Sequence, residues 1–139
     1  LQSLLDSVRG RSPQANILVM GDMNMPVTDT LLHTIASPRI EEALKQNKLV
    51  NWALSYPDSL TYPTYRYCGD WSKIDAFLVS PSLLDSLRWD CLPHRFDYSP
   101  LLEKDLEYGG YKPRRTRKGI AFRAGYSDHL PIGVIVRFK

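Results

Sequence analysis

Residues 16–26, NILVMGDMNMP, limit the possible folds more than any other part of the sequence. Residues 17–20 form an uninterrupted apolar run, which is typical of a short strand buried on both faces of a sheet. Gly21 interrupts the run, and Pro26 prevents the strand from continuing. Asp22 and Asn24 lie between them, so the segment predicts a rigidly held polar site at the end of a strand.

Two further segments place polar residues beside predicted strands. Residues 126–132, YSDHLPI, set Asp128 next to His129, just ahead of a predicted strand over residues 133–138. Residues 73–80, KIDAFLVS, form another apolar run that carries one acid, Asp75, shortly after Lys73. Each segment alone is a weak signal, and only the three together, in this order, form a specific pattern.

In this order, GDMN, KIDAFLVS and SDHLPI resemble the C-terminal half of the endonuclease/exonuclease/phosphatase superfamily, whose fold is typified by DNase I and exonuclease III. The resemblance covers nearly all of the chain. It implies an α/β fold, a DNase I-like four-layer α/β sandwich, of which residues 1–139 supply roughly the C-terminal half and contain no second domain. It also implies a missing N-terminal half, since the family draws a metal-binding glutamate and other site residues from that half.

The residues fit the chemistry of phosphodiester hydrolysis, which requires a water nucleophile and neutralisation of charge on the phosphoryl and leaving oxygens. Asp22 can accept a proton from water, and the amide of Asn24 can donate to a phosphoryl oxygen. His129 can hydrogen-bond the phosphate, and a neighbouring carboxylate favours its charged form. Asp128 can hold that imidazole or bind a hard cation such as Mg²⁺ or Mn²⁺.

The resemblance assigns the same residues to the active site. Carried over by motif, these are Asp22, Asn24, Asp128 and His129, and Asp75 is implied as an orienting residue behind them. Asp75 also has an alternative interpretation as a paired structural charge. Lys73 stands where the family often has a basic residue and receives no catalytic role.

The basic residues gather in one segment. The chain carries a formal net charge of +3, while residues 112–118, KPRRTRK, hold five cations in seven positions. Its residues Arg114, Arg115, Arg117 and Lys118 are candidates for steering a polyanionic substrate, and a solvated loop is an equally good interpretation.

No apolar run approaches the roughly 20 residues of a transmembrane helix. Cys68 and Cys91 are too few for a disulfide scaffold, and we expect buried free thiols before a single bridge. The sequence leaves the compartment open.

The periodicity predicts a helix from the first residues to about Gly10, a helix after Thr28 or Asp29, and a helix or loop over residues 41–47. Residues 62–68 predict a strand that pairs as a hairpin with residues 74–80. Residues 88–96 predict a strand interrupted by Pro93, and residues 99–121 a loop with helical turns over 101–106. The aromatic residues here can stack on nucleobases, although packing in the hairpin is the expected role: Tyr62, Tyr65, Tyr67 and Trp71.

The first functional expectation is therefore a metal-dependent phosphoester hydrolase of the nuclease or phosphodiesterase type, acting on phosphodiesters in nucleic acid. The resembling family also hydrolyses inositol phosphates and sphingomyelin, so the motifs leave the substrate open. Because the site lacks the residues of the N-terminal half, we expect a fragment that is slow or inactive in isolation. A non-catalytic module that binds anions or nucleic acid is the alternative, and a structural half that must pair with the N-terminal half is the third.

Overall fold

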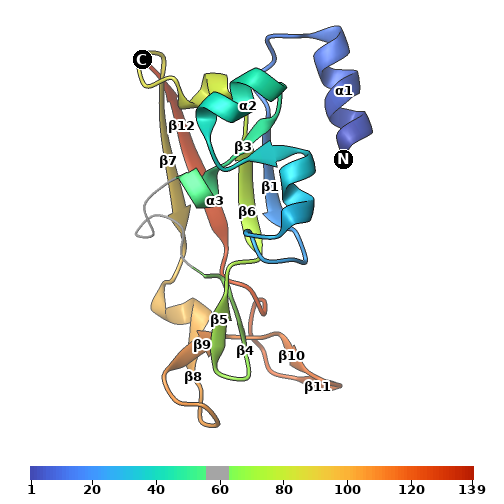
Figure 1. The fold of residues 1–139 in the computed structure, drawn as a ribbon. Coiled ribbons are helices and arrows are strands. Elements are labelled where there is room, and N and C mark those ends of the chain that lie inside the picture. The colour runs from blue at the N-terminus through green and yellow to red at the C-terminus, as the bar shows by residue number, and fades with distance from the viewer. Residues whose placement is uncertain (56–62) are drawn as a thin grey trace.

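The computed structural model describes residues 1–55 and 63–139, and Figure 1 shows their mixed α/β arrangement. Tyr62 and the start of the strand expected over residues 62–68 lie outside the described residues. A four-stranded sheet in the order β1-β6-β3-β2 forms the centre, and four two-stranded sheets surround it. The central strands are β1 (Leu18–Asp22), β2 (Ala36–Ser37), β3 (Leu49–Asn51) and β6 (Asp75–Val79).

Strand β6 lies at the centre of the hydrophobic core. It pairs antiparallel with β1 along its whole length and with β3 at its end. Successive side chains of a strand point to opposite faces, so Ala76 and Leu78 pack on one face while Phe77 and Val79 pack on the other. All four are buried, and each fully buried large side chain contributes about 1.5–3 kcal/mol of hydrophobic stabilisation.

Strand β1 differs from its prediction. We expected a strand buried on both faces, yet β1 lies at the edge of the described sheet and Met20 is 44% exposed. The strand also continues through Gly21 to Asp22, because both residues pair with β6. The strand that is buried on both faces is β6, whose apolar run is flanked by two strands rather than one.

The helices cover the sheet as short elements. Helix α1 (Gln2–Arg11) confirms the helix expected at the start of the chain, and its Leu5 packs on the face that carries Ala76 and Leu78. Asp29 caps the 3-10 helix η1 (Thr30–Thr34), which is shorter than the predicted helix because the chain enters β2 at Ala36. The remaining helical elements of the described residues are α2 (Ile40–Gln46), α3 (Trp52–Ser55), η3 (Pro81–Leu84) and η4 (Ser99–Leu101).

A long two-stranded ribbon, β7 (Trp89–Arg95) with β12 (Ile132–Phe138), packs against the second face of the sheet. Its inward side chains include Ile132 and Val134, which join the cluster around Phe77. Pro93 does not interrupt β7, contrary to expectation. In the described chain β7 pairs only with β12, so the missing N–H of proline removes no ladder bond on its other side.

Three small hairpins form a separate group below the sheet, which we call the hairpin lobe (Figure 1). They are β4 (Tyr65–Tyr67) with β5 (Asp70–Ser72), β8 (Leu102–Lys104) with β9 (Tyr111–Pro113), and β10 (Arg117–Lys118) with β11 (Ala121–Phe122). The predicted hairpin of residues 62–68 with 74–80 is therefore wrong. Cys68 and Gly69 both adopt positive φ and turn the chain at once, so β4 pairs with β5 while β6 enters the central sheet.

The loop and helical turns expected over residues 99–121 are also corrected. Only Ser99–Leu101 is helical there, and the following residues form β8, β9 and β10. These strands are two or three residues long and rich in charge, so they lack the alternation that identifies a strand in a sequence.

Both cysteines are free. Cys68 is exposed rather than buried as expected, because it occupies the tight turn between β4 and β5. Cys91 is half-buried and its thiol donates to the carbonyl of Leu83, and burial, followed by the nearby Asp90, raises its pKa. Among the described residues, no helix is long and apolar enough to cross a membrane.

Candidate active site

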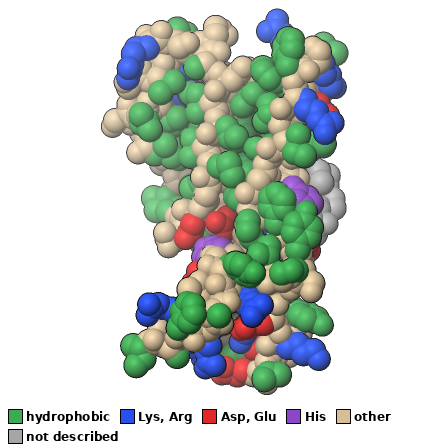
Figure 2. All heavy atoms as spheres, turned by 180° about the vertical axis from the view of Figure 1, so that it is seen from behind, with side chains coloured by type: hydrophobic (Ala, Val, Ile, Leu, Met, Phe, Trp, Pro, Cys, Tyr) green, Lys and Arg blue, Asp and Glu red, His purple; other side chains and the backbone are tan. Residues whose placement is uncertain are grey.

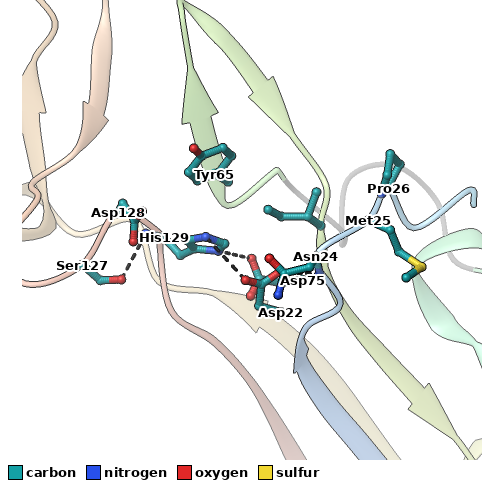
Figure 3. A pocket seen from close by; sticks show the side chains of 10 residues that line it. Asp22, Asn24, Met25, Pro26, Tyr65, Asp75, Ser127, Asp128 and His129 are labelled. Carbon is teal, nitrogen blue, oxygen red and sulfur yellow. Dashed lines mark hydrogen bonds and ion pairs between the residues drawn. The ribbon is translucent and has the colours of Figure 1, made fainter. Parts of the chain in front are cut away.

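An open pocket of about 650 Å³ lies where β1 and β6 end, between the central sheet and the hairpin lobe. Figure 3 shows the side chains around it, and Figure 2 shows acidic and histidine side chains gathered at the narrow middle of the molecule. The pocket brings together all four residues assigned to the active site from their motifs, together with the expected orienting residue: Asp22, Asn24, Asp128, His129 and Asp75.

The GDMN segment is held by backbone bonds on both sides of its turn. Gly21 has φ +137°, a conformation that side-chain-bearing residues rarely adopt, which explains a glycine directly before Asp22. Asp22 Oδ1 accepts the backbone N–H of Asn24 at 2.8 Å, so the two polar residues fix each other. The N–H of Met23 donates to the carbonyl of Ile74 at 2.8 Å, which ties the turn to the start of β6.

Asp22 and Asp75 are paired directly across β1 and β6. Opposed residues of an antiparallel pair point to the same side, and two carboxylates in that position repel each other. The imidazole of His129 lies between them: its Nδ1 is 2.8 Å from Asp75 Oδ2, and its Nε2 is 3.9 Å from Asp22 Oδ2 (Figure 3). The strand register therefore creates the negative charge that a histidine or a cation balances.

Asp75 lines the pocket but its carboxylate is already engaged. Its Oδ2 accepts a hydrogen bond from the hydroxyl of Thr64, which is almost fully buried, and the same oxygen meets His129 Nδ1. A carboxylate at Nδ1 selects the tautomer that carries its proton there and leaves Nε2 turned towards Asp22. This placement agrees with the interpretation of Asp75 as a residue that orients His129.

Tyr65 contacts His129 through both its backbone and its ring. Tyr65 and His129 form an isolated antiparallel bridge, and the N–H of Leu130 donates to the carbonyl of Thr64 at 2.8 Å. The rings of Tyr65 and His129 lie 4.8 Å apart between centroids at 37°. Backbone pairing and ring contact together restrict the rotation of the imidazole.

Asp128 lines the pocket from another direction. It is exposed, and Figure 3 places it on the opposite side of His129 from Asp22 and Asn24. The hydroxyl of Ser127 accepts the N–H of His129 at 3.1 Å, which stabilises the turn that presents both residues. Among the described residues, the ligand atoms of Asp22, Asp75 and His129 lie within 4.8 Å of one another, and Asp128 is not part of that group.

The donor set fits a hard divalent cation. Mg²⁺ commonly uses one or two carboxylates and completes its shell with water and substrate phosphate. Asp22 presents a partly exposed carboxylate, while Asp75 is already bound to His129 and Thr64. Asp22 therefore offers the most accessible carboxylate of the group Asp22, Asp75 and His129, while Asp128 lines the pocket outside that group.

The basic segment divides between two environments. Arg115 is half-buried: it donates to the carbonyl of Arg66 at 2.9 Å, and its guanidinium lies 5.6 Å from the ring centre of Tyr65. Arg114 is also half-buried, whereas Arg117 and Lys118 are exposed on β10. Only Arg115 thus reaches the wall of the pocket, through Tyr65.

Tyr65 and Thr64 are the site residues that motif reasoning missed. Tyr65 was expected to pack in a hairpin, but it lines the pocket and contacts His129. Its only sequence signal is its position in an alternating aromatic strand shortly before Asp75. The bridge to His129 joins residues far apart in the chain, so no local pattern reports it.

A model described as the Endonuclease/Exonuclease/phosphatase family matches residues 1–138. The matched range contains all three motifs and every residue of the pocket. No curated protein and no solved structure matches the chain.

Proposed function

Because the chain belongs to the endonuclease/exonuclease/phosphatase family, a group of phosphoester hydrolases with a DNase I-like fold, we propose that it is a metal-dependent phosphodiesterase acting on nucleic acid. The carrying observation is the imidazole of His129 held between Asp22 and Asp75 at the end of two paired strands. A rigid acid–imidazole–acid arrangement at the wall of an open pocket is suited to phosphoryl chemistry.

Each residue has a role in this proposal. Asp75 holds the proton on Nδ1 of His129, so Nε2 faces the pocket as an acceptor for a hydrogen bond from the water that attacks. Once Nε2 is protonated, the imidazolium can donate to a phosphoryl oxygen. Asp22 orients that water or accepts its proton, and the amide of Asn24 donates to a phosphoryl oxygen. Asp22, the accessible carboxylate of the group with Asp75 and His129, would hold Mg²⁺ or Mn²⁺, which supplies charge neutralisation on the phosphoryl and leaving oxygens when bound. We also propose Asp128 as a metal ligand, on the strength of its motif alone.

We further propose that residues 1–139 form the C-terminal portion of a four-layer sandwich whose N-terminal half completes both the sheets and the site. Two features support this. Among residues 1–55 and 63–139, strand β1 is at a sheet edge and β7 and β12 form a two-stranded sheet, so backbone groups remain for further pairing. On the ribbon, the cross-strand partners Leu92 and Ile135 are 46% and 50% exposed, a pair that a covering layer would bury.

The test is hydrolysis of a bis-aryl phosphodiester and of plasmid DNA, with Mg²⁺, with Mn²⁺ and with a chelator. The 139-residue chain is compared with the same chain preceded by its upstream sequence, each with an Asp22→Ala variant. We expect chelator-sensitive activity in the longer protein that falls by about 100-fold or more in Asp22→Ala. A longer protein that folds but hydrolyses no phosphoester would contradict the catalytic roles.

That negative outcome would favour a non-catalytic module that binds anions through the exposed Arg117 and Lys118. Binding by such a module weakens steeply with salt and is indifferent to chelator. Salt dependence and chelator dependence therefore separate the two functions.

A further inference from the structure

The hairpin lobe contains a second pocket of about 460 Å³. It lies between the β4–β5 turn, the β8–β9 loop and the β10–β11 hairpin, three segments that come from separate parts of the chain. Figure 2 shows Lys and Arg side chains distributed over this lower part of the molecule. Six cationic side chains and three carboxylates line the pocket: Arg66, Lys104, Lys112, Arg115, Lys118, Arg123, Glu103, Asp105 and Glu107.

The inner charges of this pocket are paired around one carboxylate. Asp105 is buried and lies 3.3 Å from Arg66 and 3.2 Å from Lys112. Burial alone would raise the pKa of Asp105, but N–H donors from Glu107 and Tyr108 and the Lys112 ammonium outweigh it and lower the pKa. These pairs hold the hairpins β4–β5 and β8–β9 together and build the floor of the pocket.

The outer charges are not balanced. Within the described parts of the chain, Lys104, Arg115 and Arg123 have no carboxylate within ion-pair distance. Lys118 is 3.9 Å from Glu107, but both side chains are well exposed, and such pairs attract weakly. A concave surface with surplus positive charge is a site for an anion.

Arg115 connects this pocket to the candidate active site. Its guanidinium lines the second pocket, lies 5.6 Å from the ring centre of Tyr65 and is fixed by a 2.9 Å bond to the carbonyl of Arg66. Tyr65 in turn contacts His129. A ligand that extends from the first pocket therefore passes Tyr65 and meets a guanidinium that is already oriented, which reduces the entropy lost on binding.

Two aromatic rings favour a nucleic acid over other polyanions. Tyr67 and Tyr108 line the same pocket and are 64% and 50% exposed. Proteins that bind single strands combine cations along the backbone with exposed rings on which bases stack. An inositol phosphate has no base to stack on these rings, so it would contact the cations alone.

We propose that this second pocket is a subsite for the strand of a nucleic-acid substrate beyond the scissile phosphate. Lys104, Arg115 and Arg123 bind a phosphate of the same strand, and Tyr67 and Tyr108 offer their rings to the adjoining bases. The inference rests on the proposed function for the identity of the reaction, but the binding that it describes does not require turnover.

The experiment measures fluorescence anisotropy of a labelled single-stranded oligothymidylate with the 139-residue chain in chelator, over a series of salt concentrations. The test variant is Lys104→Ala/Arg123→Ala, and the control is Lys45→Ala/Arg88→Ala, which removes two exposed cations that line neither pocket. We expect the test variant to bind roughly tenfold more weakly at low salt, with a smaller salt slope by about one to two. The control variant keeps the wild-type affinity and slope.

Equal affinity of wild type and test variant would overturn the subsite, as would an absence of oligothymidylate binding combined with binding to phosphatidylcholine vesicles that contain a phosphoinositide. A Tyr67→Leu variant separates base from phosphate: we expect it to weaken oligothymidylate binding more than inorganic polyphosphate binding. An equal effect on both ligands would overturn the nucleic-acid assignment. If no form of the protein hydrolyses a phosphoester while the test variant still binds oligothymidylate more weakly than wild type, the proposed reaction fails and the subsite stands.

Discussion

At the scale of single residues, Gly21 sets the position of Asp22. Its φ of +137° lies where an added Cβ strains the backbone, although no atom lies within 4 Å of the place that the Cβ would occupy. The cost of a substitution is therefore conformational rather than steric, which makes the position a clean test of the backbone requirement.

We expect Gly21→Ala to lower the free energy of unfolding by more than about 1 kcal/mol, because alanine is incompatible with this conformation. Chemical denaturation followed by circular dichroism measures the change. Gly10→Ala is the matched control, since Gly10 lies in α1 with open space around its Cα and no positive φ. There the substitution should be neutral or stabilising by up to about 1 kcal/mol. Equal destabilisation at both positions would contradict the account.

In the proposed reaction, Asp75 acts through His129 rather than on the substrate. In Asp75→Asn the side chain keeps its size but loses the charge that fixes the Nδ1 proton, so we expect kcat of the longer protein to fall by about 100-fold or more, with KM little changed. The pH–rate profile should also change shape, which a purely structural defect would not cause. Asp70→Asn, an exposed aspartate of β5, is the control. An unchanged profile with reduced kcat would assign Asp75 to stability alone.

At the scale of elements, the hairpin lobe depends on one buried ion pair. Arg66 and Asp105 expose 8% and 5% of their side chains and lie 3.3 Å apart. The Arg66 guanidinium also donates to the carbonyls of Gly69 and Tyr111, so it connects the β4–β5 turn to β9. The two chain segments that make the lobe, one before β6 and one before β12, are joined here.

We expect Arg66→Ala to destabilise the protein by about 1–3 kcal/mol, because Asp105 keeps only Lys112 as a cationic partner and two carbonyls lose their donor. Loss of the β8–β9 contacts should accompany it, measured as faster amide hydrogen exchange in residues 102–113. Arg117→Ala removes an exposed cation from the neighbouring hairpin and should change stability by less than about 0.5 kcal/mol. Similar losses in both variants would rule out the pair as the connection.

The lowered pKa of Asp105 also predicts a pH dependence. Its carboxyl has an ordinary value of 3.8 and a lower value in the folded protein, so its stabilisation is fully present above pH 3.8 and is lost as pH falls through the lowered pKa. Asp105→Asn should therefore show a shallower loss of stability than wild type below pH 3.8. Denaturant unfolding from neutral to acidic pH measures both curves. Parallel acid limbs would contradict the assignment.

At the scale of the whole molecule, the ribbon β7–β12 presents one face to the core and the other to solvent. The outer pair Leu92 and Ile135 is apolar and half exposed. If the N-terminal half of the domain covers this face, the same side chains favour self-association in the shorter chain, where they are exposed. In the longer chain they form a buried, stabilising contact.

We expect Leu92→Thr/Ile135→Thr to reduce self-association of the 139-residue chain, measured by light scattering across a concentration series. In the longer protein the same double variant should cost on the order of 1–2 kcal/mol per side chain, since it removes buried apolar area. A double variant that leaves the stability of the longer protein unchanged would contradict coverage of this face.

Local sequence patterns were enough to predict the family and the residues that line the pocket. Glycine, proline and carboxylates at fixed positions in GDMN and SDHLPI report local backbone geometry, and the family match over residues 1–138 confirms the resemblance that these motifs carry. The first helix and the last strand were also predictable, because their apolar spacing or run is local.

The contacts between residues distant in the chain could be known only from the tertiary structure. The register that opposes Asp22 to Asp75, the bridge from Tyr65 to His129 and the pair Arg66–Asp105 all join residues distant in the chain. The choice of β5 over β6 as the partner of β4 depended on a turn at Cys68, a residue type that seldom adopts positive φ. Local patterns report which residues a site uses, but long-range pairing fixes which of them touch, because only the folded sheet brings the ends of β1 and β6 to His129.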